Sequence, residues 1–195
     1  MNPYNIKKIK DIPDKVWAAL RSKQGIRRVD LMLDYEYGKK VLEIGPGRGF
    51  LAIAICKSKN NIESYTGLEL SEKFRKHCEA MSTINHVDKA SFIRGDGSNM
   101  SEIDNSSYDT VVAAEVLEHL RDPLPMLKEI YRVLNKGGKC IISVPSQGAM
   151  PPGKTPGHVQ DFSVNEMLNL IKQAGLELIN HKQEYPWEFY LTLKL

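Results

Sequence analysis

A glycine-rich turn between two apolar runs constrains this chain more than any other feature. A short apolar strand that contains Glu43 is followed by glycines at alternate positions, Gly45, Gly47 and Gly49. The apolar run that comes next, Phe50–Ile55, predicts a helix. Glycine adopts positive φ and, because it lacks a Cβ, lets a ligand approach the backbone. Since a strand-to-helix turn also points free N–H groups at whatever lies above it, the sequence predicts a ligand-binding loop.

The spacing of the glycines separates the classes of nucleotide-binding loop. The dinucleotide fingerprint is Gly-x-Gly-x-x-Gly, and the position of its third glycine is occupied here by Phe50. No Gly-Lys-Ser/Thr ending follows, so the loop is not of the ATP-cradling type. The pattern Glu-x-Gly-x-Gly-x-Gly, which begins at Glu43, resembles instead the first motif of the class I S-adenosylmethionine (SAM) dependent methyltransferases.

Composition places the chain among ordinary globular proteins. Its 195 residues suit one domain with a sizeable core, and 42% of them are hydrophobic and 26% charged. The net charge of +3 is too small to argue for a nucleic-acid partner. Basic residues are concentrated in residues 1–40, which either form a solvated face or attract an anionic substrate.

The spacing of the cysteines and the residues at the N-terminus indicate the cellular compartment. Cys56, Cys78 and Cys140 show no Cys-x-x-Cys or metal-ligand spacing, which favours reduced thiols in a cytoplasmic protein. The first residues lack the apolar core of a signal peptide, and no apolar run approaches the ~18 residues of a membrane span. We therefore expect a soluble, cytoplasmic protein.

Residues 1–38 precede the first strand and are predicted to be a segment apart from a domain at 39–195. Apolar residues within Val16–Leu20 and Ile26–Leu33 predict two short amphipathic helices around Gly25. One interpretation is a helix pair packed on the sheet edge. The other, implied by the resemblance, is a lid over the active site, because N-terminal helices often cover the donor in similar methyltransferases. The sequence leaves both open.

Two acidic residues follow later predicted strands. Glu69 ends the strand Ser64–Glu69, 20 residues after Gly49, where a βαβ unit places a carboxylate in reach of both ribose hydroxyls. A third strand ends in Asp96 and Gly97. The resemblance implies that Asp96 binds the adenine amino group and that the next backbone N–H reaches the ring. An ordinary Asp-Gly turn explains the same two residues without a ligand.

The most specific run follows the fourth predicted strand, Tyr108–Glu115. Glu-Val-Leu-Glu-His-Leu-Arg-Asp-Pro, at residues 115–123, closely resembles the fourth-strand motif of the small-molecule methyltransferases typified by the ubiquinone/menaquinone C-methyltransferases, the type 11 family. The resemblance covers roughly residues 39–195.

Five strand–helix units and a closing hairpin predict an α/β fold. We expect a doubly wound, Rossmann-like sheet of seven mostly parallel strands with an antiparallel last strand and helices on both faces. Ligands bind such a sheet at the carboxyl strand ends. The resemblance implies SAM as cofactor, with S-adenosylhomocysteine as product. The residues expected to bind it are Glu43, Gly45, Pro46, Gly47, Gly49, Glu69, Leu70, Asp96, Gly97 and Glu115.

The expected chemistry is in-line displacement at the methyl sulfonium, which needs positioning and exclusion of water rather than an acid–base triad. An oxygen or carbon acceptor also needs deprotonation, commonly by histidine. The two candidates are His119, after the fourth strand, and His158, in the long loop 146–162. Either can instead be structural. The spacing of residues shows no metal-ligand cluster, so no metal site is predicted and a Mg²⁺-dependent catechol-type reaction is disfavoured.

The sequence lacks two motifs that nucleic-acid methyltransferases use to bind or attack a base, and this bears on the class of methyl acceptor. No Asn- or Asp-Pro-Pro-aromatic run follows the fourth strand, and Cys140 lies inside the predicted fifth strand rather than in a Pro-Cys nucleophile. We therefore expect no nucleic-acid partner and a small-molecule, lipid or sugar-type acceptor. The alternatives are a SAM-binding regulator or subunit without turnover, and an NAD(P)-dependent oxidoreductase, against which Phe50 argues. The methylated atom and the oligomeric state are not legible in the sequence.

Overall fold

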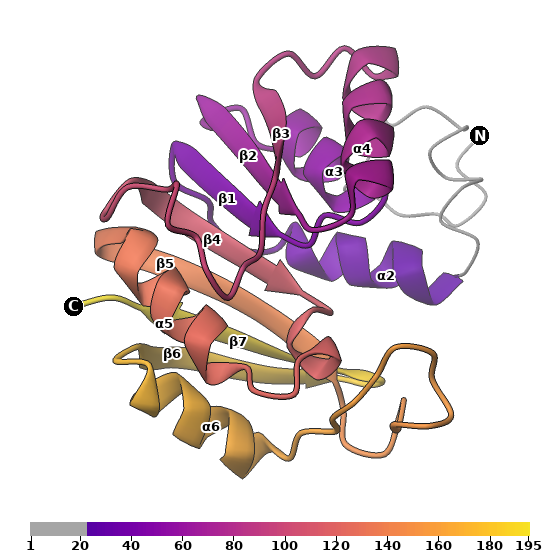
Figure 1. The fold of residues 1–195 in the computed structure, drawn as a ribbon, viewed down its shortest axis with the longest axis vertical. Coiled ribbons are helices and arrows are strands. Elements are labelled where there is room, and N and C mark those ends of the chain that lie inside the picture. The colour runs from indigo at the N-terminus through magenta and orange to yellow at the C-terminus, as the bar shows by residue number, and fades with distance from the viewer. Residues whose placement is uncertain (1–22) are drawn as a thin grey trace.

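The computed structural model describes residues 23–195, in which strands are mostly followed by helices (Figure 1). Residues 95–107 connect the third strand to the fourth without a helix, so one of the five predicted strand–helix units lacks its helix. The strands are β1 (Lys40–Ile44), β2 (Ser64–Glu69), β3 (Ala90–Arg94), β4 (Tyr108–Ala114), β5 (Leu134–Pro145), β6 (Glu177–Glu184) and β7 (Trp187–Leu193). The helices are α2 (Lys23–Met32), α3 (Phe50–Ser58), α4 (Glu72–Ile84), α5 (Leu124–Val133), α6 (Val164–Gln173) and the short 3₁₀ helix η1 (Leu117–His119).

The strands form one seven-stranded sheet in the order β3-β2-β1-β4-β5-β7-β6. Each neighbouring pair from β3 to β5 is parallel, whereas β7 runs antiparallel to both β5 and β6. This confirms the predicted doubly wound sheet with an antiparallel last strand. The strand order reverses where β1 lies between β2 and β4, so the glycine loop after β1 emerges at the switch point of the sheet.

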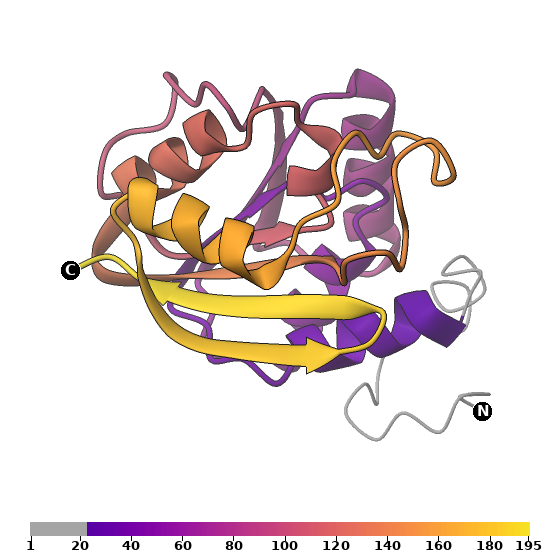
Figure 2. The same cartoon turned by 90° about the horizontal axis from the view of Figure 1, so that it is seen from below.

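Two apolar clusters cover the two faces of the sheet. Val41 of β1 and Val112 of β4 pack with α2 and α3, whereas their neighbours Leu42 and Val111 pack with α5 and α6. This alternation follows from the two-residue period of a strand. Figure 2 shows α5 and α6 on one side of the sheet and α2 on the other. Both faces are buried, as expected for a parallel sheet with crossover helices.

Serine side chains cap the starts of two helices. The Ser71 side chain accepts a hydrogen bond from the backbone N–H of Phe74 at the start of α4. Ser163 and Glu166 form a reciprocal capping box at the start of α6. Because caps satisfy N–H groups that no helical carbonyl can reach, they fix where the chain turns from each strand end into the next helix.

The N-terminal prediction needs one correction. Gly25 lies inside α2 rather than between two helices, and the first expected helix, at Val16–Leu20, lies outside the described residues. Ile26, Val29 and Met32 of α2 are buried in the cluster that also contains α3. The apolar face of α2 therefore packs on the domain. A role for the N-terminal segment as a lid over the active site stays a prediction.

The passage from α5 into β5 contains a left-handed backbone turn. Helix α5 ends at Val133, and the β5 pairing already begins at Leu134, opposite Tyr108. Gly137 has a φ of 76°, and the β4–β5 register shifts between Tyr108 and Thr110. The left-handed turn is therefore present as an irregularity within the strand. No helix within residues 23–195 has the length and apolarity to cross a bilayer.

Candidate active site

The glycine loop turns from β1 into α3 through three residues with positive φ: 67° at Gly45, 55° at Gly47 and 77° at Gly49. A Cβ on Gly45 would lie 2.8 Å from Cγ2 of Val116, and one on Gly49 would lie 3.2 Å from Sγ of Cys78. Packing explains these two glycines without a ligand. A Cβ on Gly47 would have no described atom within 4 Å. The space above Gly47 is therefore open, which fits a ligand lying against the loop.

Glu69 ties the glycine loop to the neighbouring strand–helix unit. Its Oε2 accepts a hydrogen bond from the N–H of Gly47 at 3.0 Å, and its Oε1 accepts one from the N–H of Ser71 at 2.9 Å. The residue is buried, whereas Leu70 beside it is 65% exposed. Each carboxylate oxygen keeps a lone pair, so Glu69 can still accept hydrogen bonds from a ligand. The structure thus brings Glu69 and Gly47 together, as the sequence predicted.

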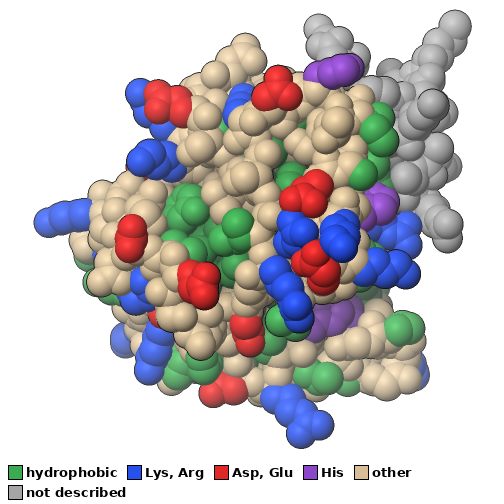
Figure 3. Space-filling view, turned by 45° about the horizontal axis from the view of Figure 1, so that its top comes forward, with side chains coloured by type: hydrophobic (Ala, Val, Ile, Leu, Met, Phe, Trp, Pro, Cys, Tyr) green, Lys and Arg blue, Asp and Glu red, His purple; other side chains and the backbone are tan. Residues whose placement is uncertain are grey.

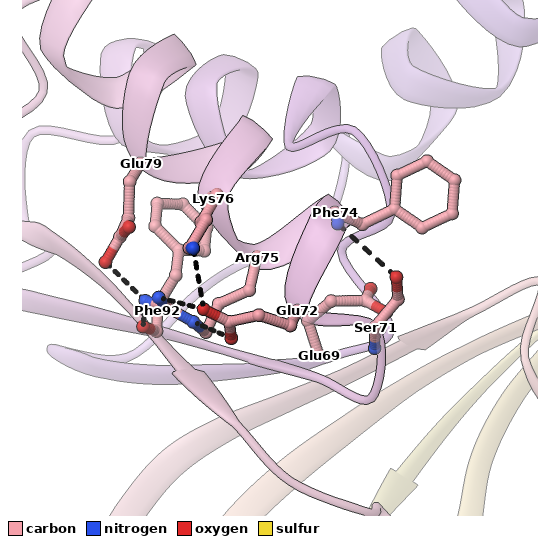
Figure 4. Close-up of polar contacts among 8 residues, drawn as sticks. All are labelled: Glu69, Ser71, Glu72, Phe74, Arg75, Lys76, Glu79 and Phe92. Atoms are coloured by element: carbon pink, nitrogen blue, oxygen red, sulfur yellow. Dashed lines mark hydrogen bonds and ion pairs between the residues drawn. The ribbon is translucent and has the colours of Figure 1, made fainter.

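A salt-bridge network holds the start of α4 against the sheet (Figure 4). The Arg75 guanidinium donates to Glu72 at 2.7 Å, to Glu79 at 2.5 Å and to the Phe92 carbonyl of β3 at 3.2 Å. The Arg75 hydrogen bond lowers the pKa of Glu72 to about 2. These contacts fix the turn from which Glu69 approaches Gly47.

Asp96 and Gly97 follow β3 at the same edge of the sheet. Asp96 is exposed, and its Oδ1 accepts a hydrogen bond from the Ser98 N–H at 2.8 Å. A Cβ on Gly97 would lie 2.5 Å from Ile44 and 2.7 Å from Met126, so packing alone requires glycine there. The turn is therefore self-supporting, and the Oδ2 of Asp96 is available to a ligand.

Glu43 lies below the loop rather than beside the open space. It is buried, and its Oε2 accepts a hydrogen bond from the Tyr65 hydroxyl at 2.8 Å. Burial raises the pKa of Glu43 to about 7, opposed by the Tyr65 hydrogen bond and the charge of Arg28. The described hydrogen bond of the Glu43 side chain is therefore with the core tyrosine, and a role in donor binding stays a prediction.

The raised pKa of Glu43 predicts a pH dependence of stability. Since the folded value lies above the unfolded value of 4.5, the folded state binds more protons, and the free energy of unfolding falls as pH rises from 4.5 through about 7. We expect Glu43→Gln to flatten this part of the curve, measured by urea denaturation from pH 4 to 8. An unchanged slope would contradict the assignment. The titratable groups that interact with Glu43 are Arg28, Tyr37, Cys56, Tyr65, Glu69 and Cys78.

Glu115 stands at the carboxyl end of β4 with a φ of 57°, uncommon for a residue other than glycine. Its carboxylate accepts hydrogen bonds from the Ser143 hydroxyl at 3.3 Å and from the Trp187 indole N–H at 3.1 Å. Burial raises the pKa of Glu115. Residues with strained backbone conformations are often found at functional sites. Here the positive φ of Glu115 turns the chain from β4 into η1.

The long loop 146–162 is held against η1. The N–H groups of Val159 and Gln160 both donate to the Glu118 carbonyl, at 2.9 and 3.2 Å. The Nδ1 of His119 lies 2.8 Å from the Gly157 carbonyl oxygen. These contacts place the His158 ring perpendicular to the His119 ring, with 4.9 Å between centroids. The two candidate bases, which are 39 positions apart in the chain, therefore form a pair.

Glu118, which is not among the predicted site residues, is buried next to the two histidines. Its side chain is 1% exposed, and neither carboxylate oxygen has a hydrogen-bond partner within residues 23–195. Burial, and then the charge of Glu115, raise the pKa of Glu118 to about 8. Ligand atoms of Glu118, His119 and His158 all lie within 4.8 Å of one another, a grouping that the spacing of residues in the sequence does not show. The one signal for Glu118 in the sequence is its place in the motif at residues 115–123.

Comparison with known proteins agrees with this geometry. A family model described as a methyltransferase domain matches residues 42–142. A Mycolicibacterium smegmatis protein named "probable S-adenosylmethionine-dependent methyltransferase" is 31% identical over 72% of this chain, which spans about half (53%) of that relative. The ubiquinone biosynthesis O-methyltransferase of Aliivibrio fischeri is 24% identical over 91% of this chain and 84% of its own length.

Solved structures share the fold. A SAM-dependent methyltransferase from Aquifex aeolicus has a TM-score of 0.76 at 16% identity, covering 95% of this chain and 100% of the other. A SAM-dependent methyltransferase from Mesorhizobium loti has a TM-score of 0.72 at 15% identity, covering 89% of this chain and 99% of the other. Together with the family match, which spans more than half of the sequence, these findings show that the chain belongs to the class I SAM-dependent methyltransferases of the type 11 family and that its cofactor is SAM.

Proposed function

We propose that the protein transfers a methyl group from SAM to a small-molecule, lipid or sugar-type acceptor. The observation that carries the proposal is the open space above Gly47, bordered by Glu69, at the switch point of the sheet. An oxygen acceptor is favoured because the O-methyltransferase relative aligns over 91% of this chain.

The donor contacts follow from the positions of the residues. The backbone of Gly45–Gly49, with Pro46, lies under the methionyl part, and Glu43 supports that loop from below. Glu69 accepts hydrogen bonds from the ribose hydroxyls, and Leu70 offers an exposed apolar surface next to it. Asp96 and the N–H of Gly97 bind adenine, and Glu115 borders the reacting end.

When bound, SAM supplies a methyl group that its sulfonium already makes electrophilic. The protein therefore has to align two reactants and exclude water, and alignment alone can supply about 7–11 kcal/mol of the barrier. The hydrogen bonds that hold the loop 146–162 against η1 support a role for this loop in excluding water from the reacting groups. The paired rings of His119 and His158 would handle the proton of an acceptor hydroxyl, a role supported by their position after β4 and in the loop 146–162.

A nucleic-acid acceptor has less support. On the face shown in Figure 3, Lys and Arg side chains are interspersed with Asp and Glu, and the described residues form no continuous basic surface there. A binding surface for nucleic acid needs several phosphate contacts from clustered basic residues. The described residues on this face therefore give no support to a nucleic-acid acceptor.

Calorimetric titration with SAM, S-adenosylhomocysteine and NAD(H) tests the proposal at the donor step. We expect saturable binding of both adenosyl ligands and none of NAD(H). Formation of S-adenosylhomocysteine is then measured across a panel of hydroxylated small molecules. Binding without turnover on any acceptor would favour the non-catalytic alternative, and NAD(H) binding without SAM would favour the oxidoreductase.

Replacement of the histidine pair tests the acceptor side. We expect His119→Ala and His158→Ala each to lower turnover by ~100-fold, the usual contribution of an aligned proton-transfer group, while SAM binding stays unchanged. His181→Gln is the matched control, since His181 also contacts a buried glutamate, Glu188, at 2.8 Å but lies in β6. Parental turnover in both alanine variants would remove the pair from the mechanism.

A further inference from the structure

The cluster of Glu118, His119 and His158 has a feature that methyl transfer alone does not explain. Glu118 is 1% exposed, and neither of its carboxylate oxygens has a hydrogen-bond partner within the described residues. Buried polar groups almost always have a partner, because an unpaired one loses its hydration without compensation. The Nε2 of His158 is 4.0 Å from Oε1 of Glu118, too far for a hydrogen bond. An interaction that would satisfy this carboxylate is therefore missing.

The hydrogen bonds of the two rings determine which nitrogen is free. Nδ1 of His119 lies 2.8 Å from the Gly157 carbonyl oxygen, and Nδ1 of His158 lies 3.0 Å from that of Met150. A carbonyl oxygen only accepts, so each Nδ1 carries the hydrogen, and in the neutral ring Nε2 keeps the lone pair. Histidines that bind metals are typically oriented in this way, with the second nitrogen donating to a backbone carbonyl.

We propose that Glu118, His119 and His158 form a binding site for a first-row transition-metal ion such as Zn²⁺. One ligand atom from each residue lies within 4.8 Å of the others. Metal–ligand distances of about 2.0–2.2 Å require ligand atoms ~3.4 Å apart. Binding would therefore require side-chain rotations that move the ligand atoms of the three residues closer together by about 1 Å. The backbone bonds from Val159 and Gln160 to the Glu118 carbonyl keep the loop close enough for this closure.

The ligand set indicates the class of ion. Two imidazoles and one carboxylate suit Zn²⁺, Fe²⁺ or Co²⁺, whereas Mg²⁺ prefers an all-oxygen set. Three protein ligands also leave coordination positions open to an external molecule.

The role of the ion in turnover rests on the proposed function, but its binding does not. An acceptor hydroxyl at an open position would release its proton to solvent water more readily, because a cation stabilises the resulting alkoxide or phenolate. The Nε2 atoms would then act on the acceptor through the ion rather than by accepting its proton directly.

The test is titration of the purified, EDTA-treated full-length protein with Zn²⁺, and separately with Co²⁺ followed by visible absorption. We expect one ion per chain, and Co²⁺ bands of a nitrogen- and oxygen-ligated site. Glu118→Gln and His158→Gln keep side-chain shape and should weaken binding by at least about 10-fold, a loss that even outer-shell changes produce. His181→Gln should bind as the parent does.

The outcomes separate this inference from the proposed function. One-to-one binding that is lost in Glu118→Gln and His158→Gln supports the site, whatever the acceptor proves to be. Absence of binding in the parent, or equal binding in all variants, overturns it. SAM titration of the same EDTA-treated samples measures the donor site independently, so a failure of the metal site leaves donor binding intact.

Discussion

Gly47→Val is expected to abolish donor binding, lowering the affinity for SAM by at least about 100-fold, or about 2.8 kcal/mol. The loop brings Gly47 to the surface of an open space, where a Cβ would meet no described atom within 4 Å. The valine side chain would fill the volume that the ligand needs. Calorimetric titration with SAM and S-adenosylhomocysteine measures the effect.

Gly137→Val is the matched control for this substitution. Gly137 also has a positive φ, 76° against 55° at Gly47, and also faces open space, but it lies in the irregular start of β5. Valine at a positive φ costs about 1–3 kcal/mol at either position, so both variants should lose similar stability while only Gly47→Val loses the ligand. If strain prevents folding, Gly47→Asn and Gly137→Asn repeat the comparison, because asparagine tolerates this conformation. Parental SAM affinity in folded Gly47→Val would show that the loop is not the donor site.

The fold was predictable because its signals are local. The apolar runs of β1 and β4, the glycines between β1 and α3 and the serine caps of α4 and α6 each act over a few residues. Right-handed crossovers then leave few ways to assemble the sheet. The errors also have local causes. Gly25 is tolerated inside α2 because Ile26, Val29 and Met32 are buried around it, so packing overrides a helix-breaking residue.

The donor side of the site was predictable for the same reason, whereas the acceptor side was not. Gly47 and Glu69 lie at the ends of adjacent parallel strands, so their meeting follows from the order of the strands. His119 and His158 meet because backbone groups of an irregular loop bond to the Glu118 carbonyl, and no periodicity encodes such contacts. Glu118 was missed because its significance is its burial without a partner, which depends on residues distant in the chain.

Glu69→Ala is expected to have the second large effect, weakening SAM binding by about 100-fold. The side chain accepts hydrogen bonds from Gly47 and Ser71, so its loss removes both the ordering of the loop and the proposed acceptor for two ribose hydroxyls. Hydrogen bonds to charged groups contribute ~1.5–3 kcal/mol each. Glu63→Ala, which removes an exposed carboxylate just before β2, should leave the affinity unchanged.

A ligand without ribose hydroxyls separates the two contributions of Glu69. The 2′,3′-dideoxy analogue of S-adenosylhomocysteine should bind the parent more weakly than S-adenosylhomocysteine does, and Glu69→Ala should narrow that difference by at least about 10-fold. If the variant loses affinity equally for both ligands, Glu69 acts only by ordering Gly47, and the ribose assignment fails. Because loop ordering affects both ligands alike, the difference between them depends on direct contact with the hydroxyls, which makes this comparison the decisive one for the donor site.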